Sequence, residues 1–284
     1  MNMRCTVHSS GAEFLKACEE YLLRNESEHN LILGKRAEAD ANAADGTDVT
    51  RISIHRNDTV VGAAVLHPSE RSLLSRMDEP SIHALIGFMD ATNIRIDSVV
   101  GPIESSECFA DSWKEITETT PRLLLHTGVY ELTEVVFPDP DGRKLIPAGT
   151  VDPDLAFQYL LGFLADCFPD LPDPQRSARQ MLERHAGNGT LFFWQGEEDS
   201  VPVSMAAKTR ESRNGATISL VYTPPQLRKR GHASRMVAAL SDRCLKDGKR
   251  FCNLFADVKN PTSNAIYQEI GYRKIAESKH FRFS

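Results

Sequence analysis

The segment Val221-Tyr222-Thr223-Pro224-Pro225-Gln226-Leu227-Arg228-Lys229-Arg230-Gly231-His232-Ala233-Ser234 is the most informative stretch of this chain. Its two adjacent prolines cannot donate hydrogen bonds to a sheet, so they end the strand before them. Gly231 lets backbone N–H groups approach a ligand at the start of the next helix, where the helix dipole favours an anion. The segment therefore predicts a phosphate-binding loop between a strand and a helix. It fits neither the Walker pattern nor the dinucleotide-binding glycine pattern.

The helix that follows this loop is predicted by the period of its apolar residues. At about 100° per residue, five of these residues fall within an arc of roughly 100°. They are Ala233, Met236, Val237, Leu240 and Cys244. The polar residues Arg235, Asp242 and Lys246 lie opposite, so one face of the helix is expected to be buried.

Three basic residues, Arg228, Lys229 and Arg230, stand directly before this helix. Positive charge at a helix N-terminus opposes the helix dipole and is locally unfavourable, and a bound anion would remove that penalty. The run therefore favours an anion site. The alternative is a solvated charge run beside an ordinary loop glycine.

A second motif runs from Asn260 to Tyr272. Asn260 suits the N-cap of a short helix, Pro261 its first position and Gly271 its exit. Three polar residues at spacing i, i+4 and i+7 share one face of this helix: Asn260, Asn264 and Tyr267. A polar stripe of this kind faces something other than the core. Packing is the alternative role of Tyr267, and capping by Asn260 is expected in addition to any function.

Together the two segments resemble the GNAT superfamily of acyl-CoA N-acyltransferases. Arg228, Gly231 and Ala233 match the family pattern Arg/Gln-x-x-Gly-x-Gly/Ala, and residues 260–272 match Asn-Pro-x-Ser-Asn-x-x-Tyr-x-x-x-Gly-Tyr. One amphipathic helix and one apolar strand, residues 251–256, separate the two motifs. The resemblance covers roughly the C-terminal half. It implies an α/β fold with a mixed, mostly antiparallel sheet that is flanked by helices and opens where two neighbouring strands diverge.

The resemblance also implies a binding site for acetyl-CoA as cosubstrate. Backbone N–H groups of the loop would hold the pyrophosphate, the strand before it would pair with the pantetheine arm, and the second motif would hold that arm from the other side. The implied coenzyme-binding residues are Val221, Tyr222, Thr223, Arg228, Lys229, Arg230, Gly231, His232, Ala233, Ser234, Asn260, Asn264 and Tyr267. For His232, packing or a phosphate contact is expected rather than catalysis.

The implied general acid is Tyr267, which would protonate the departing thiolate. With ordinary pKa values near 10 for tyrosine and about 8.5 for a thiol, this transfer is uphill by roughly 2 kcal/mol. Asp257, three residues before Asn260, is the best placed carboxylate for a general base acting through water. A loop hydrogen-bond acceptor is the alternative role of Asp257.

Composition limits the other classes of function. The chain has 284 residues, of which 41% are hydrophobic and 25% charged, as in ordinary globular proteins. Its net charge of −6 argues against a nucleic-acid partner. No apolar stretch is long enough to span a bilayer and the start is not a signal peptide, so we expect a cytoplasmic protein with no membrane partner. The six cysteines form no Cys-x-x-Cys pair, so neither disulfides nor a metal are expected.

A turn-rich segment, residues 137–142, suggests a domain boundary. It divides the chain into residues 1–137 and a catalytic domain, residues 138–284. The first half shows a fainter version of the same pattern, and after Leu66, where a phosphate loop is expected, residues 67–73 contain no glycine. We interpret it as a degenerate GNAT-like copy that has lost coenzyme binding. An unrelated α/β domain is the alternative. The alanine-rich acidic stretch 37–48 is expected to be an exposed loop.

The predicted function is transfer of an acetyl group from acetyl-CoA to a primary amine by direct attack on the thioester. The acceptor, a small molecule or a peptide, cannot be identified from the sequence, and nor can the oligomeric state. Residues 154–186 and a terminal hairpin, residues 271–283, are expected to wall the acceptor site. A non-catalytic acyl-CoA-binding sensor or scaffold is the alternative.

Overall fold

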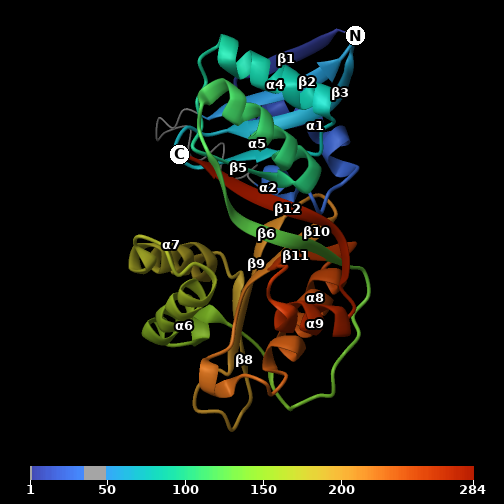
Figure 1. Cartoon of the computed structure of the whole chain (residues 1–284). Coiled ribbons are helices and arrows are strands. Elements are labelled where there is room, and N and C mark those ends of the chain that lie inside the picture. The colour runs from blue at the N-terminus through green and yellow to red at the C-terminus, as the bar shows by residue number, and fades with distance from the viewer. Residues whose placement is uncertain (1, 35–48) are drawn as a thin grey trace. The chain divides into compact units, whose positions relative to one another are not determined.

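The computed structural model describes residues 2–34 and 49–284, so the stretch 37–48, expected to be an exposed loop, lies outside the described residues. The chain forms two compact units (Figure 1). The first unit takes the chain up to Val129 together with Ala256–Asn260 and Lys274–Ser284, and the second takes Tyr130–Phe255 and Pro261–Arg273. The units therefore do not correspond to a single cut in the chain. Each is described by itself below.

The first half of the chain contains ten principal elements. They are β1 (Met3–His8), α1 (Gly11–Leu23), α2 (Asn30–Gly34), β2 (Thr50–Arg56), β3 (Thr59–Leu66), β4 (Arg71–Leu74), α4 (Glu79–Ala91), β5 (Ser98–Pro102), α5 (Ile103–Thr117) and β6 (Pro121–Leu132). Strands β1 to β4 pair antiparallel in sequence order, and β4 pairs parallel with β5. The helix α4 connects these two parallel strands.

The second half repeats this order element by element. It contains β7 (Lys144–Pro147), α6 (Pro153–Cys167), α7 (Pro174–Gly187), β8 (Leu191–Gln195), β9 (Ser204–Glu211), β10 (Gly215–Tyr222), α8 (His232–Lys246), β11 (Phe251–Asp257), α9 (Pro261–Glu269) and β12 (Arg273–Phe283). Strands β7 to β10 pair antiparallel, and β10 pairs parallel with β11 through the connecting helix α8. The repeat confirms the predicted tandem fold of mostly antiparallel sheets with flanking helices. The first half therefore has the same fold pattern as the second.

The C-terminal strand β12 belongs to the sheet of the first unit. It pairs antiparallel with β5, from Ser278 opposite Pro102 to Arg282 opposite Ser98. The strand order in that unit is β1-β2-β3-β4-β5-β12-β6, and in the second unit it is β11-β10-β9-β8-β7. The predicted terminal hairpin is therefore wrong. Residues 273–283 contain no glycine, proline or asparagine to form a tight turn, so the segment continues as one strand.

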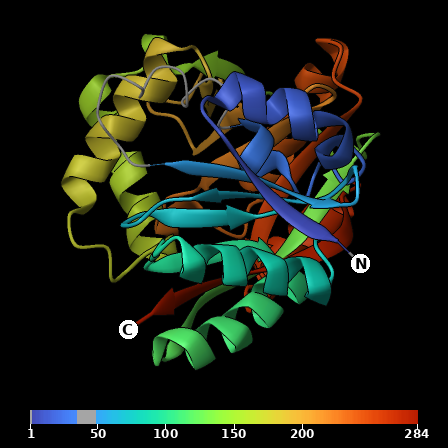
Figure 2. The same cartoon turned by 90° about the horizontal axis from the view of Figure 1, so that it is seen from above.

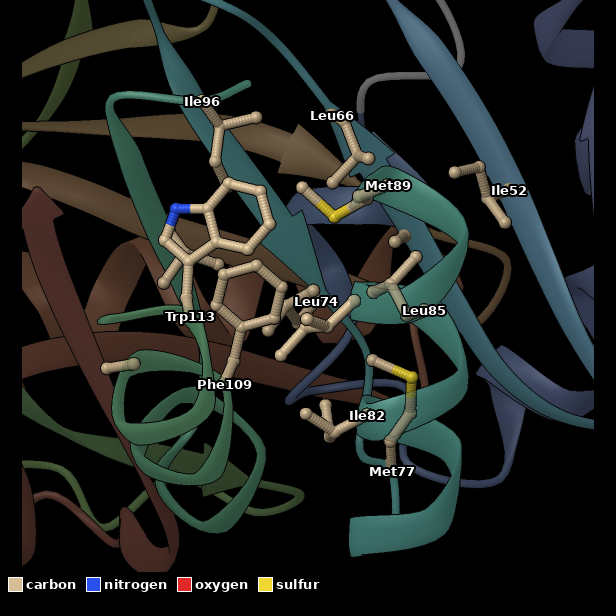
Figure 3. Close-up of a cluster of buried hydrophobic side chains, with 14 of the residues drawn as sticks. Ile52, Leu66, Leu74, Met77, Ile82, Leu85, Met89, Ile96, Phe109 and Trp113 are labelled. Atoms are coloured by element: carbon tan, nitrogen blue, oxygen red, sulfur yellow. The ribbon is translucent and has the colours of Figure 1, made fainter. Parts of the chain in front are cut away.

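Helices cover both faces of the sheet in the first unit. Helices α4 and α5 pack on the face that carries Ile52 and Leu66, where Phe109 and Trp113 of α5 stack with ring centroids 5.6 Å apart (Figure 3). Helix α1 packs on the opposite face through a separate cluster that includes Phe14. Seen from above, α1 and the pair α4 and α5 lie on opposite sides of the strands (Figure 2).

In the first unit, the strand-to-helix connection that corresponds to the predicted phosphate-binding loop lies later in the chain than the sequence suggested. Residues 67–70 make a tight turn, in which Nδ1 of His67 accepts hydrogen bonds from the backbone N–H groups of Ser69 and Glu70. The strand β4 follows, so the crossing is residues 75–78, before α4. A four-residue strand directly after a turn is too short to show a period-2 pattern.

In the second unit, α6 packs on one face of the sheet and α8 on the other. Leu160 and Leu164 of α6 join a buried cluster with Phe193 and Met205 of the strands. On the other face, the buried residues of α8 include Met236, Val237, Leu240 and Cys244, as their spacing predicted. Ala233 of the predicted face is only half-buried.

Candidate active site

The strand β10 is irregular near its end. Its pairing with β9 shifts register between Ser219 and Tyr222, and Leu220 adopts φ +53°. The left-handed region is costly for leucine, so the surrounding pairing must hold this residue there. The result is a bulge that re-aims the last residues of the strand, including Val221.

The parallel strands β10 and β11 separate beside this bulge. Their registered pairs run only from Gly215 opposite Phe251 to Thr217 opposite Asn253. Beyond that pair β10 continues to Tyr222 without a registered partner on β11. The backbone groups on this edge are therefore open to a ligand that lies between the strands. This is the opening that the family resemblance implies.

The N-terminus of α8 lacks the side-chain cap that four other helices have. Helices α1, α4, α6 and α7 have side-chain N-caps, which are Ser10, Asp78, Asp152 and Asp173. The N-cap of α8 is Gly231, with φ +74° and no side-chain hydrogen bond, and the first turn has no acidic residue. Helix N-terminal N–H groups without a partner attract anions. Ser234, in this first turn, is buried.

The three basic residues before α8 have different environments. Lys229 and Arg230 are exposed, and neither forms an ion pair within the described residues. Arg228 instead donates from Nη2 to Asp166 on α6 at 2.5 Å and from Nε to the carbonyl of Thr223 at 2.9 Å. Its guanidinium also lies 5.8 Å from the centre of the Tyr222 ring. Arg228 therefore fixes the start of the loop.

Tyr222 and Thr223 are held by their side chains. The ring of Tyr222 packs so closely on Gly162 of α6 that a Cβ there would lie 2.3 Å from the ring. Oγ1 of Thr223 lies 2.9 Å from Oγ of Ser204, which also donates to the carbonyl of Tyr222. The half-buried Val221 precedes them. The strand end is thus held by side-chain contacts with Gly162 and Ser204.

The side chain of His232 is buried and lies beside Asp141. Its Nδ1 lies 3.5 Å from Oδ2 of Asp141, which also accepts from Nη1 of Arg143 at 3.3 Å and from Nε1 of Trp194 at 3.4 Å. Burial and the charge of Arg143 lower the pKa of His232, although Asp141 opposes this shift. His232 therefore has a packing contact, and its expected place in the coenzyme site stays a prediction.

Arg235, on the first turn of α8, extends the same network to the loop. Its Nε donates to the carbonyl of Asp139 at 2.5 Å, and its Nη1 donates to the carbonyl of Arg230 at 2.9 Å. A Cβ at Gly231 would lie 2.4 Å from this Nη1. The φ of +74° is what favours glycine at position 231, and any other side chain there would also have to displace the guanidinium of Arg235.

Tyr267 on α9 is 8% exposed and lies in an aromatic group. Its ring centroid is 6.4 Å from that of Tyr130 and 6.1 Å from that of Tyr272. Burial raises the pKa of Tyr267, so the phenol is protonated at neutral pH. Asn264, one turn earlier on α9, is half-buried. The polar face predicted for this helix is therefore in part a packing face.

Asp257 and Asn260 lie in the segment that is grouped with the first unit. Oδ1 of Asp257 accepts from the backbone N–H of Lys259 at 2.8 Å, and its carbonyl accepts from the N–H of Asn260 at 3.0 Å. Asp257 therefore accepts a loop hydrogen bond, as its alternative role predicts, and its role as a base stays a prediction. Asn260 is exposed and directly precedes α9.

Sequence reasoning missed three polar residues near this site: Asn253, Asp141 and Arg235. Asp141 lay in a segment that looked like a linker, and Arg235 was assigned to the solvent face of its helix. Asn253 lies within an apolar strand, and it could have been found as the one amide in residues 251–256.

Comparison with known proteins agrees with this geometry. Residues 198–281 match the family described as FR47-like protein. An acetyltransferase of the GNAT family from Colwellia psychrerythraea superposes with a TM-score of 0.56 at 11% identity, over 99% of this chain and 100% of that one. A Drosophila protein gives 0.69 at 11% identity, over 99% and 98%. A tandem GNAT protein from the clavulanic acid biosynthesis pathway gives 0.56 at 12% identity, over 100% and 98%. No curated protein sequence matches the chain.

The chain therefore has the tandem GNAT fold, and the resemblance drawn from its two motifs is confirmed. The fold is that of N-acetyltransferases. No helix in residues 2–34 and 49–284 is both long and apolar enough to cross a membrane.

Proposed function

We propose that residues 138–284 transfer an acetyl group from acetyl-CoA to a primary amine. The amine nitrogen attacks the thioester carbonyl, a C–N bond forms and the C–S bond breaks. The amine loses one proton and the coenzyme A thiolate gains one. The observation that carries this proposal is a bulged strand, open toward β11, that leads through a basic loop into the uncapped N-terminus of α8.

The pyrophosphate of coenzyme A fits the start of α8. The first-turn N–H groups after Gly231, from His232 through Ala233 to Ser234, supply donors, and the exposed Lys229 and Arg230 supply positive charge. Arg228 acts indirectly in this proposal, because its guanidinium is held by Asp166. The pantetheine arm then follows the open edge of β10, where the backbone groups of Val221 and Thr223 can pair with its amides. Asn260 and Asn264 are proposed to hold the arm from α9.

Tyr267 is the proposed general acid. Burial keeps the phenol protonated, which is the form required, but it also makes proton release more costly than the ordinary pKa of tyrosine implies. A coenzyme thiolate formed in the same buried place would be destabilised by the same loss of water, which favours the transfer. Asp257 remains the proposed base, acting through water from the end of β11.

Calorimetric titration of the whole chain with acetyl-CoA tests the coenzyme site. Gly231→Asp places a side chain on a residue with φ +74°, where only glycine is unstrained, and it adds negative charge against the pyrophosphate. We expect its affinity to fall by at least 10²-fold. Gly149→Asp, at a glycine with nothing within 4 Å of its Cβ position, is the matched control and should bind normally. Unchanged affinity in Gly231→Asp would refute the assignment.

A panel of primary amines, with thiol release as the readout, tests turnover and acceptor together. Release that depends on one class of amine supports the transferase. Tight binding of acetyl-CoA with no release on any amine would instead favour the acyl-CoA-binding sensor.

A further inference from the structure

Asn253 is the most unusual polar side chain in the described part of the second unit. It is 1% exposed, and neither its Oδ1 nor its Nδ2 has a hydrogen-bond partner. Within the described residues, no other side chain leaves two buried polar atoms unpaired. Because buried amides are almost always hydrogen-bonded in native proteins, an orphaned one calls for a partner that the protein chain does not supply.

The position of Asn253 points to that partner. It is opposite Thr217 in the last registered pair of β10 and β11, at the base of the opening between the strands. Its neighbour Cys252 faces α8, since Sγ lies 3.5 Å from the carbonyl of Ser241. Side chains alternate along a strand, so Asn253 faces the opposite side of the sheet, together with Thr217.

The length of the strand relates this position to the proposed coenzyme site. From Tyr222, where β10 reaches the phosphate loop, back to Thr217 is five residues, or roughly 17 Å at ~3.3 Å per residue. An extended pantetheine arm has a comparable length. A pantetheine arm that runs along β10 from Tyr222 therefore brings its thioester close to the base of the opening.

We infer that Asn253 hydrogen-bonds the acyl carbonyl of the bound thioester through Nδ2. This inference rests on the proposed function, because it requires acetyl-CoA in the opening of the sheet. The carbonyl oxygen would accept a hydrogen bond from Nδ2 of Asn253, so one of its two unpaired polar atoms would gain a partner. Negative charge develops on that oxygen when an amine attacks, so the same hydrogen bond strengthens toward the transition state. Oδ1 remains available to accept from the N–H of the attacking amine.

The decisive measurement compares acetyl-CoA with coenzyme A, which lacks the carbonyl. We expect wild type to bind acetyl-CoA more tightly, and Asn253→Leu to weaken acetyl-CoA binding about fivefold, as for one net hydrogen bond. Binding of coenzyme A should change less than twofold. The free energy of unfolding without ligand should stay the same or rise, because leucine fills the space with no unpaired polar atom. Asn253→Ala serves if the leucine variant does not fold.

A spectroscopic measurement distinguishes a direct hydrogen bond to the thioester carbonyl from an indirect structural effect of the substitution. The infrared band of the ¹³C-labelled thioester carbonyl of bound acetyl-CoA should move to higher wavenumber in Asn253→Leu than in wild type, because it loses a donor. Cys252→Ala, next along β11 but facing α8, is the matched control and should leave the band in place. If both coenzyme forms lose affinity equally, or if the band does not move, the inference is overturned. If wild type binds neither form, the proposed function itself fails.

Discussion

Tyr267 must satisfy both packing and chemistry. Its ring fills a gap between Tyr130 and Tyr272, so part of its contribution is apolar burial that a phenylalanine would keep. Its hydroxyl is not needed for this packing, but the proposed role as general acid requires it. The neighbouring Tyr272 has a settled structural role, because its hydroxyl lies 2.8 Å from Oγ of Ser241 in the core. Tyr272 is therefore a suitable control for substitutions of Tyr267.

Replacing Tyr267 by phenylalanine should lower kcat by about 10²-fold with less than twofold change in acetyl-CoA affinity, because only the proton donor is lost. Tyr272→Phe should keep turnover and lose about 1 kcal/mol of stability with its buried hydrogen bond. Steady-state kinetics on an identified acceptor, with urea unfolding of both variants, checks this. Full turnover in Tyr267→Phe would mean that water or another group protonates the thiolate.

The loop that contains residues 139–143 acts as a brace for α8. Asp141 receives contacts from Arg143, Trp194 and His232, and Arg235 connects the carbonyls of Asp139 and Arg230. Both ends of the phosphate loop are therefore held, one by this brace and the other by Arg228 on Asp166. A preformed loop loses less entropy when it binds an anion.

Asp141→Asn keeps the shape of the side chain and removes its charge. We expect the affinity for acetyl-CoA to fall by about three- to tenfold, because charged hydrogen bonds are stronger than neutral ones. The affinity for S-acetylpantetheine, which lacks the pyrophosphate, should not change. Asp139→Asn is the control, since Arg235 bonds only its backbone carbonyl. Equal losses for the two ligands, or equal effects of the two variants, would show that the brace does not position the loop.

Local sequence signals predicted the elements of the second half well. The helix predicted directly after the loop is His232–Lys246, and the strand expected at 251–256 is Phe251–Asp257. Such elements carry their own periodicity and capping residues. The partner of β12 could not be predicted, because a strand records which of its faces is buried but not which strand lies beside it.

In the candidate site too, local features could be predicted from the sequence, whereas contacts between distant segments could not. Gly231 and the prolines before it determine the backbone conformation of their own segment, so the loop could be predicted from them. The contacts of Arg228 with Asp166 and of His232 with Asp141 join residues far apart in sequence. Neither pair has a spacing or composition signal. The burial of Tyr267 depends on Tyr130, from another element, in the same way.

At the scale of the whole chain, the same element order occurs twice. The two copies differ in the connection between the fourth strand and the helix that follows it. In the second unit the crossing from β10 to α8 is uncapped, basic and bulged. In the first unit the equivalent crossing from β4 to α4 is sealed by Asp78, whose carboxylate accepts from the N–H and hydroxyl of Ser81. The parallel strands also remain close there, since a Cβ at Gly101 would lie 2.9 Å from the backbone oxygen of Leu74.

We therefore expect one coenzyme per chain. A carboxylate at the start of α4 repels a pyrophosphate, and the closed strands leave no edge for a pantetheine arm. Calorimetry on the whole chain should give a stoichiometry of one, and Gly231→Asp should remove all binding rather than half of it. Asp78→Ser, which keeps a side-chain cap without the charge, should leave the stoichiometry at one, because the strands around Gly101 stay closed. A second binding event in wild type, or binding that survives Gly231→Asp, would place a coenzyme in the first unit.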